Sequence, residues 1–160
     1  MIVGANFWCL KSAWFMVVQN GPQGLRYAPA GLMFQAMSPL TQGDVVPYTW
    51  SAQPQFKLDR YPYQVPWVTA VAVRDRDQLA INLLSWHPTE PVKVQVSLKG
   101  PEIPGSEGKL LRVTGPGPDA NNEEEQPASV TLQESHVRLS KVTTLELPPV
   151  SLSTLILKIK

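Results

Sequence analysis

The residues of this sequence that could perform acid–base chemistry are carboxylates in one polar stretch. Glu123, Glu124 and Glu125 follow each other shortly after Asp119. Catalysis by paired carboxylates requires two groups held rigidly on opposite sides of the reacting bond. Adjacent like charges repel each other, and water must therefore solvate them. We expect a solvated acidic loop at this position and assign no catalytic residue to it.

Histidine, cysteine and serine supply no alternative reactive site. His87 precedes a proline and His136 begins a predicted strand, and neither has the second ligand at a defined spacing that a metal site needs. Cys9 is the only cysteine, which excludes an internal disulfide and a multi-cysteine metal site. No Gly-x-Ser-x-Gly elbow occurs, and the prolines of 115–118 lack the N–H groups of a phosphate-binding loop. We therefore expect neither a metal ion nor a cofactor.

Aromatic side chains offer a candidate binding surface of a different kind. Trp50, Tyr61, Tyr63 and Trp67 lie in the proline-rich segment 41–67, and aromatic faces can stack on the apolar faces of sugar rings. Exposed apolar area more often marks an interface between domains. Because proline does not fit a central strand, we interpret this segment as an extended interdomain strap, with sugar binding as the alternative.

The composition indicates a soluble domain with a hydrophobic core and argues against two classes of partner. Apolar residues make up 43% of the 160 residues and charged residues 17%. The net charge of +1 is far from the basic excess that binds nucleic acid. The apolar stretch 1–18 contains Asn6 and Lys11 and lacks the basic region of a signal peptide. We expect no membrane partner and no clear signal peptide, and a cytoplasmic and a secreted location both stay open.

The first 40 residues predict two short helices. Apolar residues cluster without alternation over 7–18 and again over 29–37, and Pro29 suits the first position of a helix. The residues 20–24 between these segments are typical of a turn. Ser38-Pro39 should end the second helix, because the residue before a proline avoids the α conformation.

From residue 68 onward the sequence predicts antiparallel strands. In 92–99, Val92, Val94, Val96 and Leu98 should face the core, and Lys93, Gln95 and Lys99 should face solvent. We expect a hairpin of 68–73 and 79–86 about residues 74–77, followed by strands at 109–113, 130–132, 136–139, 143–147 and 152–159. Short strands separated by turns predict a mainly β fold, an antiparallel β-sandwich over 68–160 that one or two short helices precede.

An ordered set of short motifs in this chain resembles the end of the family 51 α-L-arabinofuranosidases. These motifs are Tyr-Ala-Pro-Ala-Gly-Leu-Met-Phe at 27–34, Ala-Ile-Asn-Leu at 80–83, Thr-Glu-Pro-Val at 89–92, Leu-Arg-Val-Thr-Gly-Pro at 111–116, Asp-Ala-Asn-Asn at 119–122, Pro-Ala-Ser-Val at 127–130 and Leu-Pro-Pro-Val-Ser-Leu-Ser-Thr-Leu at 147–155. They cover nearly the whole chain. Segment 27–34 is similar to the last helix of the catalytic barrel in that family, and the later motifs are similar to its C-terminal β-domain.

The resemblance implies a parent enzyme that removes terminal α-L-arabinofuranosyl groups from plant polysaccharides. In the family, both catalytic glutamates belong to a (β/α)₈ barrel before position 1, so no catalytic residue carries over to this chain. Asn122-Glu123 matches the Asn-Glu pair of many glycosidase acid/base sites, but it lacks a preceding apolar strand and a surrounding barrel. The resemblance therefore predicts a non-catalytic C-terminal β-domain that supports the barrel and is inactive alone.

These expectations define the parts of the chain and their partners. Residues 1–40 would be the helical end of the barrel, 41–67 the strap and 68–160 the C-terminal domain. The expected partners are the barrel and, through the parent enzyme, arabinose-containing polysaccharide. We also expect self-association, because two short helices cannot enclose all the large apolar side chains of residues 7–34, which are Trp8, Trp14, Phe15, Leu32, Met33 and Phe34. The alternative is a free-standing carbohydrate-binding β-sandwich.

Overall fold

The computed structural model describes residues 17–21, 24–51, 54–57, 62–99, 107–123, 126 and 128–159. Its elements are β1 (Val18–Gly21), β2 (Gly24–Tyr27), α1 (Pro29–Met37), the 3₁₀ helix η1 (Ser38–Leu40), β3 (Asp44–Val45), β4 (Gln55–Lys57), β5 (Gln64–Pro66), β6 (Val68–Asp75), β7 (Gln78–Ser85), β8 (Val92–Ser97), β9 (Glu107–Thr114), β10 (Thr131–Arg138), β11 (Val142–Leu147) and β12 (Ser151–Lys158). The predicted mainly β, antiparallel fold with a short leading helix is confirmed.

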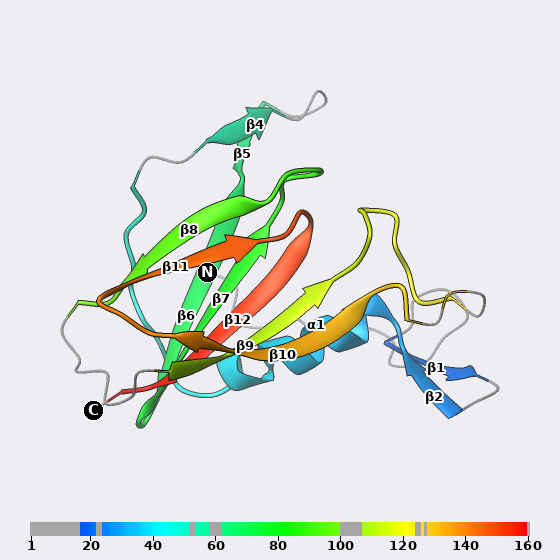
Figure 1. Ribbon diagram of the computed structural model, residues 1–160, viewed down its shortest axis with the longest axis horizontal. Helices are drawn as coiled ribbons and strands as arrows, with labels where there is room; N and C mark the ends of the chain where they lie inside the picture. The colour runs from blue at the N-terminus through cyan, green and yellow to red at the C-terminus, as the bar shows by residue number, and fades with distance from the viewer. Residues whose placement is uncertain are drawn as a thin grey trace.

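The described elements form three layers. The central layer is a six-stranded antiparallel sheet in the order β10-β9-β12-β7-β6-β3, and β8 and β11 pair to form a second, smaller sheet. Figure 1 shows β8 and β11 crossing in front of the six-stranded sheet, with α1 near β9 and β10. Helix α1 contacts β9, β10 and β12. The six-stranded sheet is therefore covered on both faces.

The hydrophobic core has two parts because the strands of the central sheet alternate between its two faces. Leu155 and Leu157 of β12 face the β8–β11 sheet, whereas Leu152 and Ile156 pack with the helix. The first cluster includes Leu79, Ile81, Leu83, Val94, Leu110, Leu145 and Leu147, and the second joins Leu111, Val113 and Val130 to Leu32, Met33, Ala36 and Met37 of the helical segment. Helix α1 thus stabilises the sheet as a packed layer.

The predicted register of β8 is confirmed. Val94 is buried at 8% exposure, and Val92, Val96 and Leu98 pack against the first cluster. Lys93, Gln95 and Lys99 are exposed. The strict two-residue period was informative here because one face of β8 meets the core and the other meets solvent.

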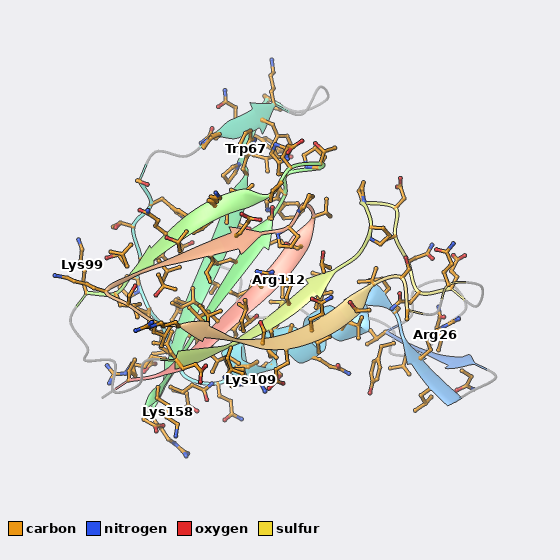
Figure 2. All side chains as sticks on the ribbon, viewed as in Figure 1. Arg26, Trp67, Lys99, Lys109, Arg112 and Lys158 are labelled. Carbon is orange, nitrogen blue, oxygen red and sulfur yellow. The ribbon has the colours of Figure 1, made fainter. Side chains whose placement is uncertain are left out.

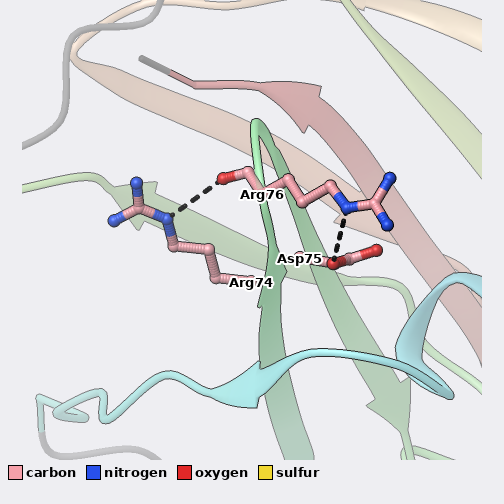
Figure 3. A network of polar contacts seen from close by, with 3 residues as sticks. All are labelled: Arg74, Asp75 and Arg76. Atoms are coloured by element: carbon pink, nitrogen blue, oxygen red, sulfur yellow. Dashed lines mark hydrogen bonds and ion pairs between the residues drawn. The ribbon is translucent and has the colours of Figure 1, made fainter.

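The expected hairpin of residues 68–86 is also present, as β6 and β7. Its turn contains Arg76 at a positive φ of 53°. Figure 3 shows Nε of Arg74 donating to the carbonyl oxygen of Arg76 at 3.4 Å, and Nε of Arg76 lying 4.0 Å from Oδ1 of Asp75. The Arg76 side chain is 90% exposed, so this ion pair contributes little to stability.

The helix predicted at 29–37 is confirmed, and α1 has Pro29 in its first turn. Ser38-Pro39 ends the α-helix as expected, and one 3₁₀ turn follows it. The hydroxyl group of Ser38 donates to the carbonyl oxygen of Gln35, and that of Thr41 donates to the carbonyl oxygen of Ser38, at 2.9 and 2.8 Å. The same two carbonyl oxygens also accept the backbone N–H groups of Ser38 and Thr41, so the hydroxyl groups add a second hydrogen bond to each carbonyl at the end of the helix.

The helix predicted at 7–18 is wrong in its described part. Residues 1–16 lie outside the described residues, Val17 is not helical, and Val18 begins β1. Strand β1 pairs with β2 in an antiparallel arrangement, in which Gly21 lies opposite Gly24 within the predicted turn 20–24. Gly24 takes a φ of +111° in this hairpin, a conformation that glycine adopts without steric cost. Residues 18–21 are extended because they pair with β2, and the clustered apolar residues of 7–18 do not reveal that pairing.

The two strands predicted at 130–132 and 136–139 are one strand, β10. It pairs with β9 along all eight of its residues. The polar middle of β10, from Gln133 to His136, is exposed, so it interrupts the apolar pattern without interrupting the hydrogen bonds between the strands.

Segment 41–67 contributes short strands. Strand β3 pairs with β6 at the edge of the central sheet, and β4 pairs with β5. The backbone N–H of Val46 donates to the carbonyl oxygen of Ala72 at 2.9 Å.

No helix among the described residues is long and apolar enough to cross a membrane.

Candidate functional site

The outer side of α1 is apolar. None of the nine helix residues is charged. Gly31 and Ala36 are buried, whereas Phe34 is 49% exposed. A helix at the surface normally shows polar or charged residues on its outer face. The exposed side of α1 is therefore better suited to contact another protein surface than water.

The β1–β2 hairpin adds exposed apolar side chains next to this helix. Leu25 is 70% exposed and Tyr27 is 41% exposed. Figure 1 shows the hairpin projecting away from the sheets, and β1 and β2 pair only with each other among the described strands. An isolated two-stranded hairpin is at best marginally stable in water. We call Leu25, Tyr27 and Phe34 the docking surface.

The acidic loop does not bring a pair of described carboxylates into a closed site. Asp119 and Glu123 are both exposed and line an open hollow with Gln126. Glu124 and Glu125 lie outside the described residues. The absence of a catalytic residue in this loop stays a prediction.

Asn122 is buried beside this hollow at 4% exposure. Its Nδ2 donates to the carbonyl oxygens of Tyr27 and Val130 at 3.1 and 2.9 Å, and its Oδ1 accepts a hydrogen bond from the N–H of Val130 at 2.7 Å. The sequence places Asn122 in the Asp-Ala-Asn-Asn motif and in the rejected Asn-Glu pair, but it does not reveal these contacts.

The two histidines lie at different sites. Nδ1 of His87 accepts a hydrogen bond from the N–H of Glu90 at 2.8 Å and caps the turn after β7. His136 is exposed, with its Nδ1 3.6 Å from Oε2 of Glu107. In the described part of the chain, no three His, Cys, Asp or Glu side chains converge as a metal site would require. Cys9 falls outside that part.

The four candidate aromatic rings do not share one environment. Trp67 packs against the first core cluster, and its ring meets the His87 ring edge-on at 4.5 Å. Trp50 is 39% exposed and Tyr63 56% exposed. Tyr61 lies outside the described residues. Trp67 therefore serves packing and is not free to stack on a sugar.

The structure adds two exposed rings that the sequence reasoning did not single out as candidates. Tyr48 meets Trp50 edge-on at 6.0 Å, and its hydroxyl group donates to the carbonyl oxygen of Ala70 at 2.7 Å. Nε1 of Trp86 donates to Oγ1 of Thr69 at 3.1 Å. These hydrogen bonds hold the two rings against Thr69 and Ala70 of β6. No local pattern in the sequence predicts these contacts.

A partly buried arginine connects the two sheets. Nε of Arg112 donates to Oγ of Ser153 at 3.2 Å, and its Nη2 donates to the carbonyl oxygen of Glu146 at 2.8 Å. Figure 2 labels Arg112 between β9 and β11. Burial lowers the pKa of Arg112 by desolvating its charge, and the Glu146 carboxylate opposes this change. Arg112 thus links β9 and β12 to β11.

Comparison with known proteins decides how this fold is classified. A family model described as the α-L-arabinofuranosidase C-terminal domain matches residues 29–151. The chain belongs to this family. A search of curated protein sequences found no match.

Solved α-L-arabinofuranosidases contain this domain fold. The enzyme from Thermotoga maritima aligns with 89% of this chain at 19% identity and a TM-score of 0.71. The family 51 enzyme from Xanthomonas axonopodis pv. citri aligns with 91% at 21% identity and 0.73, and the one from Bifidobacterium longum with 89% at 18% and 0.70. This chain spans 31%, 29% and 28% of those three chains. It therefore has the fold of the α-L-arabinofuranosidase C-terminal domain and corresponds to less than a third of each of these solved chains.

Proposed function

We propose that this α-L-arabinofuranosidase C-terminal domain supports a catalytic barrel that hydrolyses terminal α-L-arabinofuranosides. The main support is that the family model matches residues 29–151 while this chain covers less than a third of the solved enzyme chains. The remaining two thirds of such an enzyme have room for the barrel. Arabinose-containing polysaccharide is then a partner of the whole enzyme.

The docking surface lies within residues 1–40 and contacts the rest of the barrel. Leu25, Tyr27 and Phe34 are exposed on the two elements that precede the sandwich in the chain. We assign 1–40 to the end of the barrel, 41–67 to the strap and 68–160 to the C-terminal domain. Because α1 packs on β9, β10 and β12 with its inner side, its outer side can contact the barrel at the same time. Without a barrel, this surface favours self-association.

Docking is tested by measuring how tightly the barrel domain, expressed as a separate polypeptide, binds this chain. Leu25→Asp should weaken binding at least tenfold, because a carboxylate buried at an apolar interface loses its hydration. Isothermal titration calorimetry measures the dissociation constant.

Gln95→Asp is the matched control, since it introduces the same charge on the exposed side of β8. Its affinity should equal that of the unaltered chain. If Leu25→Asp bound the barrel domain as tightly as the unaltered chain does, the proposed docking surface would be refuted. If the unaltered chain did not bind the barrel domain, the supporting function would be refuted.

The chain alone should not hydrolyse an aryl α-L-arabinofuranoside. A retaining mechanism needs two carboxyl groups about 5 to 5.5 Å apart. In the acidic loop, the two carboxylates that the structure describes, Asp119 and Glu123, lie exposed on an open hollow. Release of the coloured aryl group measures turnover, with an intact family 51 enzyme as the positive control. Turnover that Glu124→Gln abolishes would show that the acidic loop is catalytic.

A further inference from the structure

Asn122 joins two parts of the chain that are distant in sequence. Its amide group donates to the carbonyl oxygen of Tyr27, which lies 95 residues earlier, and exchanges two hydrogen bonds with the backbone of Val130. Val130 belongs to the second core cluster and directly precedes β10. The amide therefore connects the rigid end of the β9–β10 pair to the end of β2.

The contact to Tyr27 lies where the hairpin turns into the helix. Tyr27 ends β2, and Ala28 precedes the first residue of α1. The N–H of Ala28 donates to the carbonyl oxygen of Val17 at 3.0 Å. A Cβ atom added at Gly31 would lie 2.4 Å from the same oxygen, so the backbone just before β1 lies too close to α1 for any side chain at this position. Hairpin and helix start are thus held together. The inner side of α1 packs on the sandwich, and Asn122 adds a hydrogen bond from the sandwich to the end of β2.

We propose that Asn122 is the positioning residue that fixes the direction of the β1–β2 hairpin relative to the β-sandwich. The functional importance of this positioning rests on the proposed function, because the hairpin carries Leu25 and Tyr27 of the docking surface. An asparagine suits the site: one oxygen accepts from Val130 while one NH₂ group donates to two carbonyl oxygens. An aspartate of the same shape keeps the acceptor and loses both donors.

The direct test measures the distance between the hairpin and the sandwich in the isolated chain. Spin labels are attached at Asn20→Cys in β1 and Ser135→Cys in β10, two exposed positions, with Cys9→Ser as background. Double electron–electron resonance should give one narrow distance distribution for the otherwise unaltered chain. Asn122→Asp should broaden or shift it, and Asn121→Asp, the same change at the exposed neighbour, should leave it narrow.

Hydrogen exchange provides the second readout. The amides of Ala28 and Leu32 donate to Val17 and Ala28. They should exchange at least tenfold faster in Asn122→Asp, because the hairpin and helix start open locally more often once the contact to Tyr27 is lost, while the amides of β7 and β12 keep their rates. Equal acceleration in β7 and β12, or a distance distribution that stays narrow, would refute the positioning role.

A further variant is used if Asn122→Asp does not fold. Asn122→Ser retains one small donor and acceptor but cannot replace all three hydrogen bonds of the amide, so it should broaden the distance distribution relative to the otherwise unaltered chain. An unchanged distribution in the folded serine variant would count against the proposal. Neither readout involves the barrel, so a failed positioning role and a failed docking function give separate results.

Discussion

Replacing Leu155 by alanine is expected to lower the free energy of unfolding by about 2–5 kcal/mol. Leu155 is 1% exposed and lies in the first core cluster. Its strand, β12, pairs with β7 on one side and β9 on the other, so the backbone cannot easily move to fill the cavity. Chemical unfolding followed by circular dichroism measures the change. The expected loss is a large part of the roughly 5–15 kcal/mol by which a typical domain is stable against unfolding.

Val142→Ala is the control for this prediction. Val142 is 45% exposed on β11, and the loss should stay within about 0.5 kcal/mol. Losses of equal size at both positions would contradict the assignment of Leu155 to the core.

Replacing Thr154 by valine should lower the free energy of unfolding by about 1–3 kcal/mol. Nδ2 of Asn82 donates to Oγ1 of Thr154 at 2.9 Å, and the two residues lie opposite each other on β7 and β12. Exposure is 5% for Asn82 and 0% for Thr154. Valine keeps the shape of threonine but leaves the Asn82 amide buried without its acceptor. The same unfolding measurement determines the loss.

Removing both polar groups should cost less than removing one. In Asn82→Leu combined with Thr154→Val, no buried donor is left without an acceptor in this pair, so part of the lost stability should return. Thr144→Val on the exposed side of β11 should change stability by at most about 0.5 kcal/mol. A double variant less stable than Thr154→Val would show that packing, and not the hydrogen bond, dominates at this site.

The sequence by itself determined the elements whose surroundings match a local pattern. The alternation from Val92 to Leu98 predicted which side of β8 meets the core, because that strand has one buried and one solvated face. Pro29 and Ser38-Pro39 predicted both ends of α1, since proline restricts the backbone around it. The ordered motifs predicted the family, which the match over residues 29–151 confirms.

Only the tertiary structure decided the elements that depend on distant partners. Strand β10 continues through its polar middle because β9 supplies its hydrogen bonds, and Val18 is extended because it pairs with Tyr27. The contact of Asn122 with Tyr27 spans 95 residues. Apolar periodicity reports which side of a segment is buried, but it does not identify the remote backbone groups with which that segment pairs. For that reason the sequence placed Asn122 in a polar loop without its distant partner, and the fold showed it as a link to the hairpin.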